Sequence, residues 1–247
     1  MIELSAITKT YAKSAVKAVD SLSLTIKNGE IFGFLGPNGA GKTTTIKVVT
    51  GVLKADCGAV RIDGVDLAAA PLDAKRRIGY VSDNPELFAR LKAAEYLNFV
   101  ADVYGVGSVE RQERIARYTA LFGIKDVLSA SIGSFSHGMK QKLLISASLV
   151  HDPDNWLLDE PMVGLDPKSA FSLKEIMRER AAAGKTVFFS THVMEVAEKL
   201  CDRLAIINKG AIVFNGTLAE LRTSQGVDDS LEKLFLELVD DSEEATA

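Results

Sequence analysis

The sequence predicts an α/β fold in which a β-rich segment comes first and a helical segment interrupts the core. Residues 1–30 alternate apolar and polar side chains in short runs, which is typical of half-buried antiparallel strands. Short continuous apolar runs, typical of buried parallel strands, appear later on both sides of a stretch with helical spacing. With 247 residues, 47% of them apolar and 25% charged, the chain is long enough for one large unit of this kind.

Composition and charge narrow the range of functions. The net charge of -4 and the pI of about 5.5 provide no basic field, so we expect no nucleic acid partner. Cys57 and Cys201 fit no metal-ligand spacing, which favours reduced thiols in a cytoplasmic protein. The first residues do not resemble a secretory signal, and no apolar run approaches the roughly 20 residues of a membrane-spanning helix. Any membrane role would therefore need a partner.

The first elements follow from changes in periodicity. Residues 22–26 alternate as a strand should, and residues 31–35 form a continuous apolar run that ends in a glycine loop. After this loop, helical spacing relates four side chains, those of Ile46, Val49, Thr50 and Leu53. The sequence therefore predicts strand, loop and helix in immediate succession.

A helical stretch follows from Lys92 to Phe122 without a strong strand signal. We therefore place a helical insert at about residues 85–150. Its first helix is expected to have an apolar face lined by Tyr96, Phe99, Val100 and Val103.

The chain then returns to α/β alternation. Residues 156–158 and 186–189 are short apolar runs that predict buried strands, and the helical pattern of residues 168–183 between them stops at Gly184. Two further runs, residues 204–208 and 211–215, flank Lys209-Gly210 and predict a hairpin.

A last helix is predicted after the hairpin. Asp229 and Glu232 are spaced as a capping box at its start, and its apolar stripe consists of Leu231, Leu234, Phe235 and Leu238. We therefore expect one domain over residues 1–222, followed by a C-terminal helix and an acidic tail over residues 223–247.

A glycine-rich loop joins the strand at 31–35 to the helix after it. Its sequence, Gly36-Pro37-Asn38-Gly39-Ala40-Gly41-Lys42-Thr43, fits G-x-x-x-x-G-K-[ST], a pattern whose backbone N–H groups wrap nucleotide phosphates. Lys42 is expected to reach the β and γ phosphates, and Thr43 to offer its hydroxyl to Mg²⁺. A glycine turn without a ligand is the alternative, which the flanking strand and helix make less favourable. The expected nucleotide contacts in this segment are Gly36, Pro37, Asn38, Gly39, Ala40, Gly41, Lys42, Thr43 and Thr44.

Two carboxylates follow the strand at 156–158. We expect Asp159 to hold Mg²⁺ through water and Glu160 to act as general base toward the attacking water. Two solvated acids at the end of a strand are the alternative, which the phosphate loop upstream disfavours. Asn155 is unexpected, because a buried strand of this type usually opens with an apolar residue.

These motifs and a third one carry a resemblance to a known family. Ser134-Phe135-Ser136-His137-Gly138-Met139-Lys140-Gln141-Lys142 is similar to the signature Leu-Ser-Gly-Gly-Gln of ATP-binding cassettes. With the loop and the carboxylates in the family's order and spacing, the chain resembles that family from about Met1 to Glu220. The resemblance implies a P-loop NTPase (RecA-like) core with an antiparallel β subdomain and an inserted helical subdomain. It also implies ATP and Mg²⁺ as cofactors and an ATPase activity.

The signature implies a contact with nucleotide held by another subunit. In the family this segment binds the γ-phosphate of ATP across a dimer interface, which assigns Ser136, His137, Gly138 and Met139 to the site. Ser136 and Gly138 match the family pattern, whereas His137 and Met139 depart from it. Taken alone, the serine is simply a helix N-cap.

Other matches depend on the family order. Gly164-Leu165-Asp166-Pro167 resembles the loop at the dimer seam, and without the family it is an ordinary turn. His192, in Ser190-Thr191-His192, matches the switch histidine that contacts the γ-phosphate, although a lone histidine at a strand end is more often structural. Tyr11, ahead of Val19, stands where the family stacks a ring on adenine, which assigns both residues to the nucleotide site.

Asp83 is the main departure from the family pattern. The segment Ile78-Gly79-Tyr80-Val81-Ser82-Asp83 ends where the family has a glutamine that contacts Mg²⁺ and the membrane partner. Aspartate is shorter and charged, so its contact with Mg²⁺ is expected to run through water. With aspartate at this position and its variant signature segment, the chain resembles the subgroup of cassettes that serve ABC-2 type exporters.

The resemblance implies a subunit that dimerises on ATP, with itself or with a different cassette, and drives a separate transmembrane permease. Such a subunit is cytoplasmic and lies on the inner face of the cell membrane through that permease. A soluble cassette acting on ribosomes or DNA is the alternative, but those carry two cassettes or a long coiled coil. A regulatory cassette without turnover is disfavoured by the presence of Glu160 and His192, which with Lys42 form the expected catalytic set.

Overall fold

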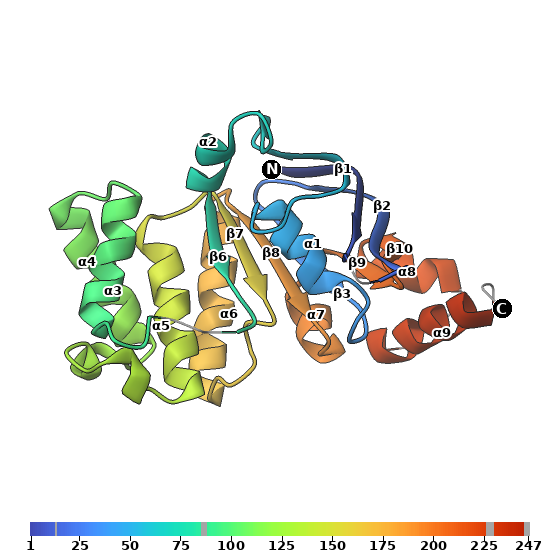
Figure 1. Ribbon diagram of the computed structural model, residues 1–247. Helices are drawn as coiled ribbons and strands as arrows, with labels where there is room; N and C mark the ends of the chain where they lie inside the picture. Colours follow the sequence, from blue (N-terminus) through green and yellow to red (C-terminus); the bar gives the residue numbers. More distant parts are fainter. Residues whose placement is uncertain (13, 85–87, 226–229, 245–247) are drawn as a thin grey trace.

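Two β-sheets with helices packed between and around them form the structure (Figure 1). It is a computed structural model that describes residues 1–12, 14–84, 88–225 and 230–244. The strands are β1 (Ile2–Thr10), β2 (Lys17–Ile26), β3 (Ile31–Leu35), β4 (Cys57–Ile62), β5 (Val65–Asp66), β6 (Ile78–Val81), β7 (Asn155–Asp159), β8 (Thr186–Thr191), β9 (Arg203–Asn208) and β10 (Ala211–Gly216). The helices are α1 (Lys42–Val49), α2 (Pro71–Arg76), α3 (Ala93–Val103), α4 (Ser108–Leu121), α5 (His137–Val150), α6 (Pro167–Ala182), α7 (Met194–Leu200), α8 (Leu218–Gln225) and α9 (Leu231–Glu244), with short 3₁₀ turns at Lys125–Val127 and Ile132–Ser134.

The larger sheet has the strand order β10-β9-β3-β8-β7-β6. Its pairs are parallel except for the β9-β10 hairpin, which confirms the parallel core and the hairpin that the sequence predicts. In a parallel sheet the carboxyl ends of the strands meet at one edge, and ligands bind in the crevice outside that edge. The loops that follow β3, β6, β7 and β8 therefore lie near one another.

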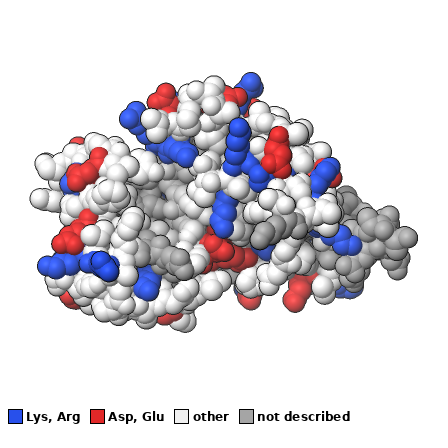
Figure 2. Space-filling model, viewed as in Figure 1, with Lys and Arg blue, Asp and Glu red and all other residues white. Residues whose placement is uncertain are grey.

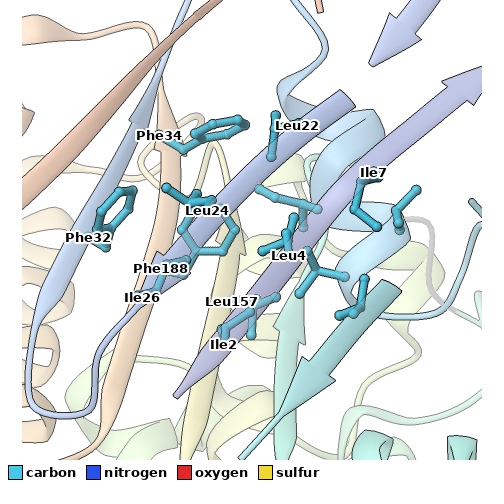
Figure 3. Close-up of a cluster of buried hydrophobic side chains, with 14 of the residues drawn as sticks. Ile2, Leu4, Ile7, Leu22, Leu24, Ile26, Phe32, Phe34, Leu157 and Phe188 are labelled. Atoms are coloured by element: carbon cyan, nitrogen blue, oxygen red, sulfur yellow. The ribbon is translucent and has the colours of Figure 1, made fainter. Parts of the chain in front are cut away.

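The smaller sheet is antiparallel, in the order β2-β1-β4-β5, and covers one face of the larger sheet. Figure 3 shows alternate side chains of β1 and β2, such as Ile2 and Leu24, directed at Phe32, Phe34 and Phe188 of the larger sheet. The Phe188 ring lies 6.1 Å from that of Phe32 and 5.6 Å from that of Phe34. Helix α1 belongs to the same cluster, so the core fixes the helix that follows the glycine loop.

Helices α5 and α6 cover the other face of the larger sheet. Trp156 and Leu158 of β7, both fully buried, pack there with Leu173 and Met177 of α6. Asn155, which opens β7, donates to Asp63 Oδ2 at 2.7 Å, so its amide links the larger sheet to the turn between β4 and β5. This bond explains a polar residue where the sequence favours an apolar one.

Helices α3, α4 and α5 lie between β6 and β7 in the sequence and share a hydrophobic cluster of their own. The expected apolar face of α3 is wrong in part. Phe99 and Val103 are 50% and 62% exposed, whereas Leu97 and Ala101 are fully buried. Tyr96 and Val100 do pack in this cluster, so the buried stripe lies to one side of the expected face, and Phe99 and Val103 leave apolar surface in solvent.

The last two helices pack against the strand and helix that border the glycine loop and the switch histidine. Leu234 and Phe235 of α9 share a cluster with Leu35, the last residue of β3, and Met194, the first of α7. The expected capping residue Asp229 lies outside the described residues, and Ser230 Oγ accepts from the N–H of Lys233 at 3.5 Å. In the part of the chain that the structure describes, none of the helices combines the length and the apolar character that a membrane crossing requires.

Candidate functional site

The loop between β3 and α1 is shaped for an anion. Gly41 precedes α1 with a φ of 111°, and no side chain caps the helix, so its first N–H groups remain available to a ligand. A Cβ at Gly41 would lie 2.4 Å from the carbonyl oxygen of Ala18, and one at Gly36 would lie 2.4 Å from that of Ile207. Side chains at these positions would displace the loop, which explains the glycines.

The ammonium group of Lys42 lies at the centre of this loop. Its Nζ donates to the carbonyl oxygens of Gly36 at 2.6 Å and Pro37 at 3.1 Å, and it lies 3.6 Å from Glu160 Oε1. Because the side chain is only 6% exposed, its ammonium group needs such partners. The ammonium group therefore lies between the loop and Glu160, where it could contact a phosphate group bound by the loop.

Asp159 ends β7 with one satisfied oxygen and one free oxygen. Its Oδ1 accepts from Ser190 Oγ at 2.6 Å, whereas Oδ2 has no hydrogen-bond partner among the described residues. Burial raises the pKa of the Asp159 carboxyl, the hydroxyls of Ser190 and Thr43 act in the opposite direction, and the charges of Asp83 and Glu160 add to the rise. A buried carboxylate oxygen without a donor, close to a threonine hydroxyl, fits a hydrated Mg²⁺ ion.

Glu160 turns away from the strand and contacts two basic residues. Its φ is 48°, in the left-handed region, and its N–H donates to Ser190 Oγ at 3.0 Å. Its Oε2 lies 3.0 Å from His192 Nδ1, while Oε1 faces Lys42. The three side chains expected to be catalytic thus form one cluster, with Lys42 at the start of α1 and Glu160 and His192 just after β7 and β8.

An open cavity of about 370 Å³ lies beside the loop. The hydroxyl of Tyr11 is 3.2 Å from Thr44 Oγ1, which places the tyrosine at the loop. Val19 is fully buried in the core, and the preceding Ala18 lines the cavity instead, because successive side chains of a strand point to opposite faces. The lining consists of Tyr11, Ala18, Pro37, Asn38, Gly39, Gly41, Lys42, Thr43, Thr44, Asp83 and Glu160.

The signature segment lies elsewhere on the chain. Ser136 caps α5, its Oγ accepting from the N–H of Met139 at 3.3 Å. The next two residues, His137 and Gly138, pack against the backbone of Gly164, so close that a Cβ at Gly138 would lie 2.5 Å from its carbonyl oxygen. Among the described residues that line the cavity, none comes from the segment 136–139.

Two contacts escaped the sequence-based assignment. Ser190 was expected only as part of the switch-histidine motif, yet its hydroxyl contacts both Asp159 and Glu160. A serine directly after the apolar run 187–189, two residues before the predicted switch histidine, was the signal available. Ala18 has no such signal, because its role depends on which face of β2 it occupies.

Comparison with known proteins identifies the family of the chain. The family model described as ABC transporter matches residues 19–163. The ABC transporter ATP-binding protein NatA of Bacillus subtilis is 38% identical over 88% of this chain and 89% of its own length. The daunorubicin/doxorubicin resistance ATP-binding protein DrrA of Streptomyces peucetius is 36% identical over 91% of this chain and 68% of its own. The chain spans 62% to 73% of several longer bacterial relatives.

Solved structures of ATP-binding cassettes have the same fold as this chain. An ATP-binding subunit of an ABC transporter superposes with a TM-score of 0.92 at 33% identity, covering 96% of this chain and 99% of the other. The dimeric cassette MJ0796, bound to ADP and phosphate in a post-hydrolysis state, superposes with a TM-score of 0.80 at 25% identity, covering 88% and 99%. Because the family model covers more than half of the chain and these relatives cover most of it, the chain belongs to the ABC transporter family as an ATP-binding and ATP-hydrolysing subunit.

Proposed function

We propose that ATP closes this subunit against a second copy of itself, and that closure and hydrolysis drive a separate transmembrane permease. One observation carries the proposal: the signature residues lie outside the cavity that the loop and the carboxylates of the same chain line. Ser136 needs a nucleotide from another subunit, and Lys42 needs a signature segment from another subunit. Since this chain carries both halves intact, two copies would complete two sites.

The residues of the cavity then have different roles in ATP binding and hydrolysis. Lys42 and the N–H groups at the start of α1 bind the phosphates, and Tyr11 provides a ring for the adenine. Thr43 and Asp159 would hold Mg²⁺, Asp159 through water, with Asp83 beside them, and the ion would offset the phosphate charge. Glu160 accepts a proton from the attacking water, and His192, 3.0 Å from it, orients the glutamate.

The permease contact is inferred from the apolar face of α3. The Phe88 ring packs edge-on at 6.3 Å against that of Phe99, and both side chains are at least half exposed. Exposed apolar groups of this kind mark interaction sites, and Phe88 follows Asp83 closely in the sequence. We infer that this surface receives a permease of the ABC-2 exporter type and holds the subunit on the cytoplasmic side of the membrane.

The remaining assignments are also proposals. Residues 1–222 would form the ATP-binding domain, with the helical insert at about 85–150, and residues 223–247 the C-terminal helix and tail. A soluble cassette acting on ribosomes or DNA is not favoured, because the relatives described above are named as transporter or drug-resistance proteins. On the face shown in Figure 2, acidic side chains lie among the basic ones, and no continuous basic field is visible.

Complementation between two inactive variants tests the shared site. Ser136→Arg and Lys42→Ala subunits should each lack turnover as homodimers. A mixture should recover activity, because each heterodimer contains one site made from an intact Lys42 and an intact Ser136. Mixing Lys42→Ala with the Lys42→Ala/Ser136→Arg double variant is the matched control, since no intact site can form. Absence of recovery in demonstrated heterodimers would contradict the proposal.

A further inference from the structure

Ser190 is a buried polar residue near the carboxyl end of β8. It is fully buried in β8, directly after Val187, Phe188 and Phe189, which are fully buried as well. A hydroxyl that leaves water without a hydrogen-bond partner destabilises the folded state. The hydrogen bonds that the serine hydroxyl makes are needed to offset the cost of burying it.

The hydroxyl makes two bonds at the catalytic edge of the sheet. It donates to Asp159 Oδ1 at 2.6 Å and accepts from the N–H of Glu160 at 3.0 Å. One serine hydroxyl can do both, because it has one donor and two acceptor positions. The sheet register places Ser190 directly opposite Asp159 on the neighbouring strand, so both contacts follow from the pairing of β7 with β8.

The bond to Glu160 supports an unusual backbone conformation. The φ of 48° at Glu160 lies in the left-handed region, which residues with a Cβ seldom adopt. That turn directs the glutamate toward Lys42 at 3.6 Å and His192 at 3.0 Å. The hydroxyl that receives the N–H of Glu160 therefore helps to fix the side chain.

The bond to Asp159 leaves a defined oxygen for a ligand. With Oδ1 occupied by Ser190, Oδ2 is the carboxylate oxygen that lacks a partner among the described residues. Rotation of the carboxylate would exchange the two oxygens, and the short bond to Ser190 opposes that rotation.

We propose that Ser190 is a positioning residue of the ATPase site, whose single hydroxyl fixes the Asp159 carboxylate for Mg²⁺ and the backbone turn of Glu160 for water activation. This inference rests on the proposed function, in which Asp159 serves the metal and Glu160 the water. It adds a residue that acts through two others, Asp159 and Glu160.

Ser190→Ala and Ser190→Thr separate this role from general stability. The alanine variant removes both bonds, whereas the threonine variant keeps a hydroxyl on the same Cβ. Ser148→Ala is the matched control, because Ser148 is also buried and its hydroxyl also makes two bonds, from Trp156 Nε1 at 2.9 Å and to the Ile145 carbonyl at 2.8 Å. Both alanine variants lose a buried, doubly bonded hydroxyl, and only one of them loses it at the site.

Two readouts are needed, one of them independent of turnover. Bonds to charged groups are of a size that changes a rate or an equilibrium by about 10- to 100-fold. We expect Ser190→Ala to lower kcat by about that factor and to raise the Mg²⁺ concentration for half-maximal activity, with a smaller change in the KM for ATP. The second readout uses a Glu160→Gln background, in which hydrolysis is blocked. ATP with Mg²⁺ should raise the Tm above its value with ATP and EDTA. The Mg²⁺ concentration needed for this rise should be higher in the Ser190→Ala protein.

The controls decide between the outcomes. Ser148→Ala should lose stability but keep the kcat and the Mg²⁺ requirement, and Ser190→Thr should keep most of the rate. Equal effects of the two alanine variants on both readouts, or a folded Ser190→Thr protein as impaired as Ser190→Ala, would overturn the positioning role. If Glu160→Gln alone retained full turnover, the proposed function itself would fail, which is a distinguishable result.

Discussion

Glu160 lies between two basic side chains at the point where the chain leaves β7. Lys42 Nζ is 3.6 Å from one carboxylate oxygen, and His192 Nδ1 is 3.0 Å from the other. These contacts hold the carboxylate at the cavity, where a base can reach water beside a phosphate. The loop N–H groups that we propose bind the nucleotide precede α1 and do not need this carboxylate.

Glu160→Gln should therefore separate hydrolysis from binding. Loss of the general base is expected to lower steady-state phosphate release by about 10² to 10⁴-fold, while ATP affinity is retained. Nucleotide titration measures the ATP affinity, and a phosphate-release assay on the same protein measures the hydrolysis rate. Glu195→Gln, at an exposed residue of α7, is the control and should change neither. Unchanged hydrolysis in the Glu160→Gln protein would exclude the base.

Asp83 is expected to act in coupling more than in binding. It lines the cavity at the loop after β6 and lies near the apolar surface of Phe88 and Phe99 in the sequence. Asp83→Ala should weaken the Mg²⁺ dependence and the stimulation by reconstituted permease more than the affinity for ATP. Asp126→Ala, at an exposed position of the helical insert, is the control. A loss of ATP binding alone, with stimulation intact, would show that the coupling role is wrong.

The sequence identifies most of the side chains at the site, because each belongs to a motif with its own chemistry. The glycine loop, Asp159, Glu160 and His192 were all assigned this way. Ser190 and Ala18 were not, since their roles arise from strand register and from the face of a strand that points to the cavity. Pairing across a sheet is a long-range property that a local motif does not encode.

At the scale of the elements, a stacked pair of rings joins the helical insert to the larger sheet. The ring of Tyr104, after α3, stacks on that of His151, after α5, with centroids 3.6 Å apart. The Nε2 of His151 lies 3.0 Å from the carbonyl oxygen of Ile78, the first residue of β6. Burial lowers the pKa of His151 to about 4, with the bond to Ile78 acting in the opposite direction.

This shift predicts an acid-dependent loss of stability. Between pH 6.5 and about 4 the unfolded chain binds a proton at His151 that the folded chain does not, so the free energy of unfolding falls as the pH falls through that window. The contribution is up to about 3 kcal/mol. Urea unfolding at pH 7 and pH 4.5 should show a smaller difference for His151→Phe than for the unchanged protein. His137→Gln, at an exposed histidine, should leave the difference as it is; an equal difference for His151→Phe would contradict the assignment.

Helix α9 is predicted to contribute to the stability of the core beside the glycine loop. Leu234 is fully buried against the cluster that contains Leu35 and Met194. Leu234→Ala should lower the free energy of unfolding by about 2 to 5 kcal/mol. Leu236→Ala, on the exposed side of the same helix, should change it by less than about 0.5 kcal/mol. Equal effects in urea unfolding would mean that α9 does not pack as described.

Elements with a clean period were predictable, and elements with mixed patterns were not. The parallel strands and α6 follow from their apolar runs and spacing. The segment with β4, β5 and α2 gave no prediction, because β4 exposes most of its side chains and β5 and α2 are only two and six residues long. The face of α3 was misassigned for Phe99 and Val103 but not for Tyr96 and Val100, because its apolar side chains occur on two sides, one toward the core and one toward solvent.

At the scale of the whole molecule, the two halves of the proposed shared ATP site lie on different parts of one chain. The loop after β3 lines the cavity, while the signature opens α5 and packs against Gly164. The Lys142 side chain pairs with Asp166 at 2.5 Å, which holds the signature helix to the start of α6. The sequence supplies both motifs but not this separation, which depends on how the helical insert packs on the larger sheet.

The most direct test is sedimentation of the Glu160→Gln protein with ATP and Mg²⁺, because blocked hydrolysis should trap the closed state. We predict a species of about twice the chain mass of 26.6 kDa that depends on ATP. The Glu160→Gln/Ser136→Arg double variant should sediment as a monomer while it still binds ATP, because the proposed signature contact crosses the interface. An unchanged protein that hydrolyses ATP at its full rate while sedimenting only as a 26.6 kDa monomer would contradict the shared site.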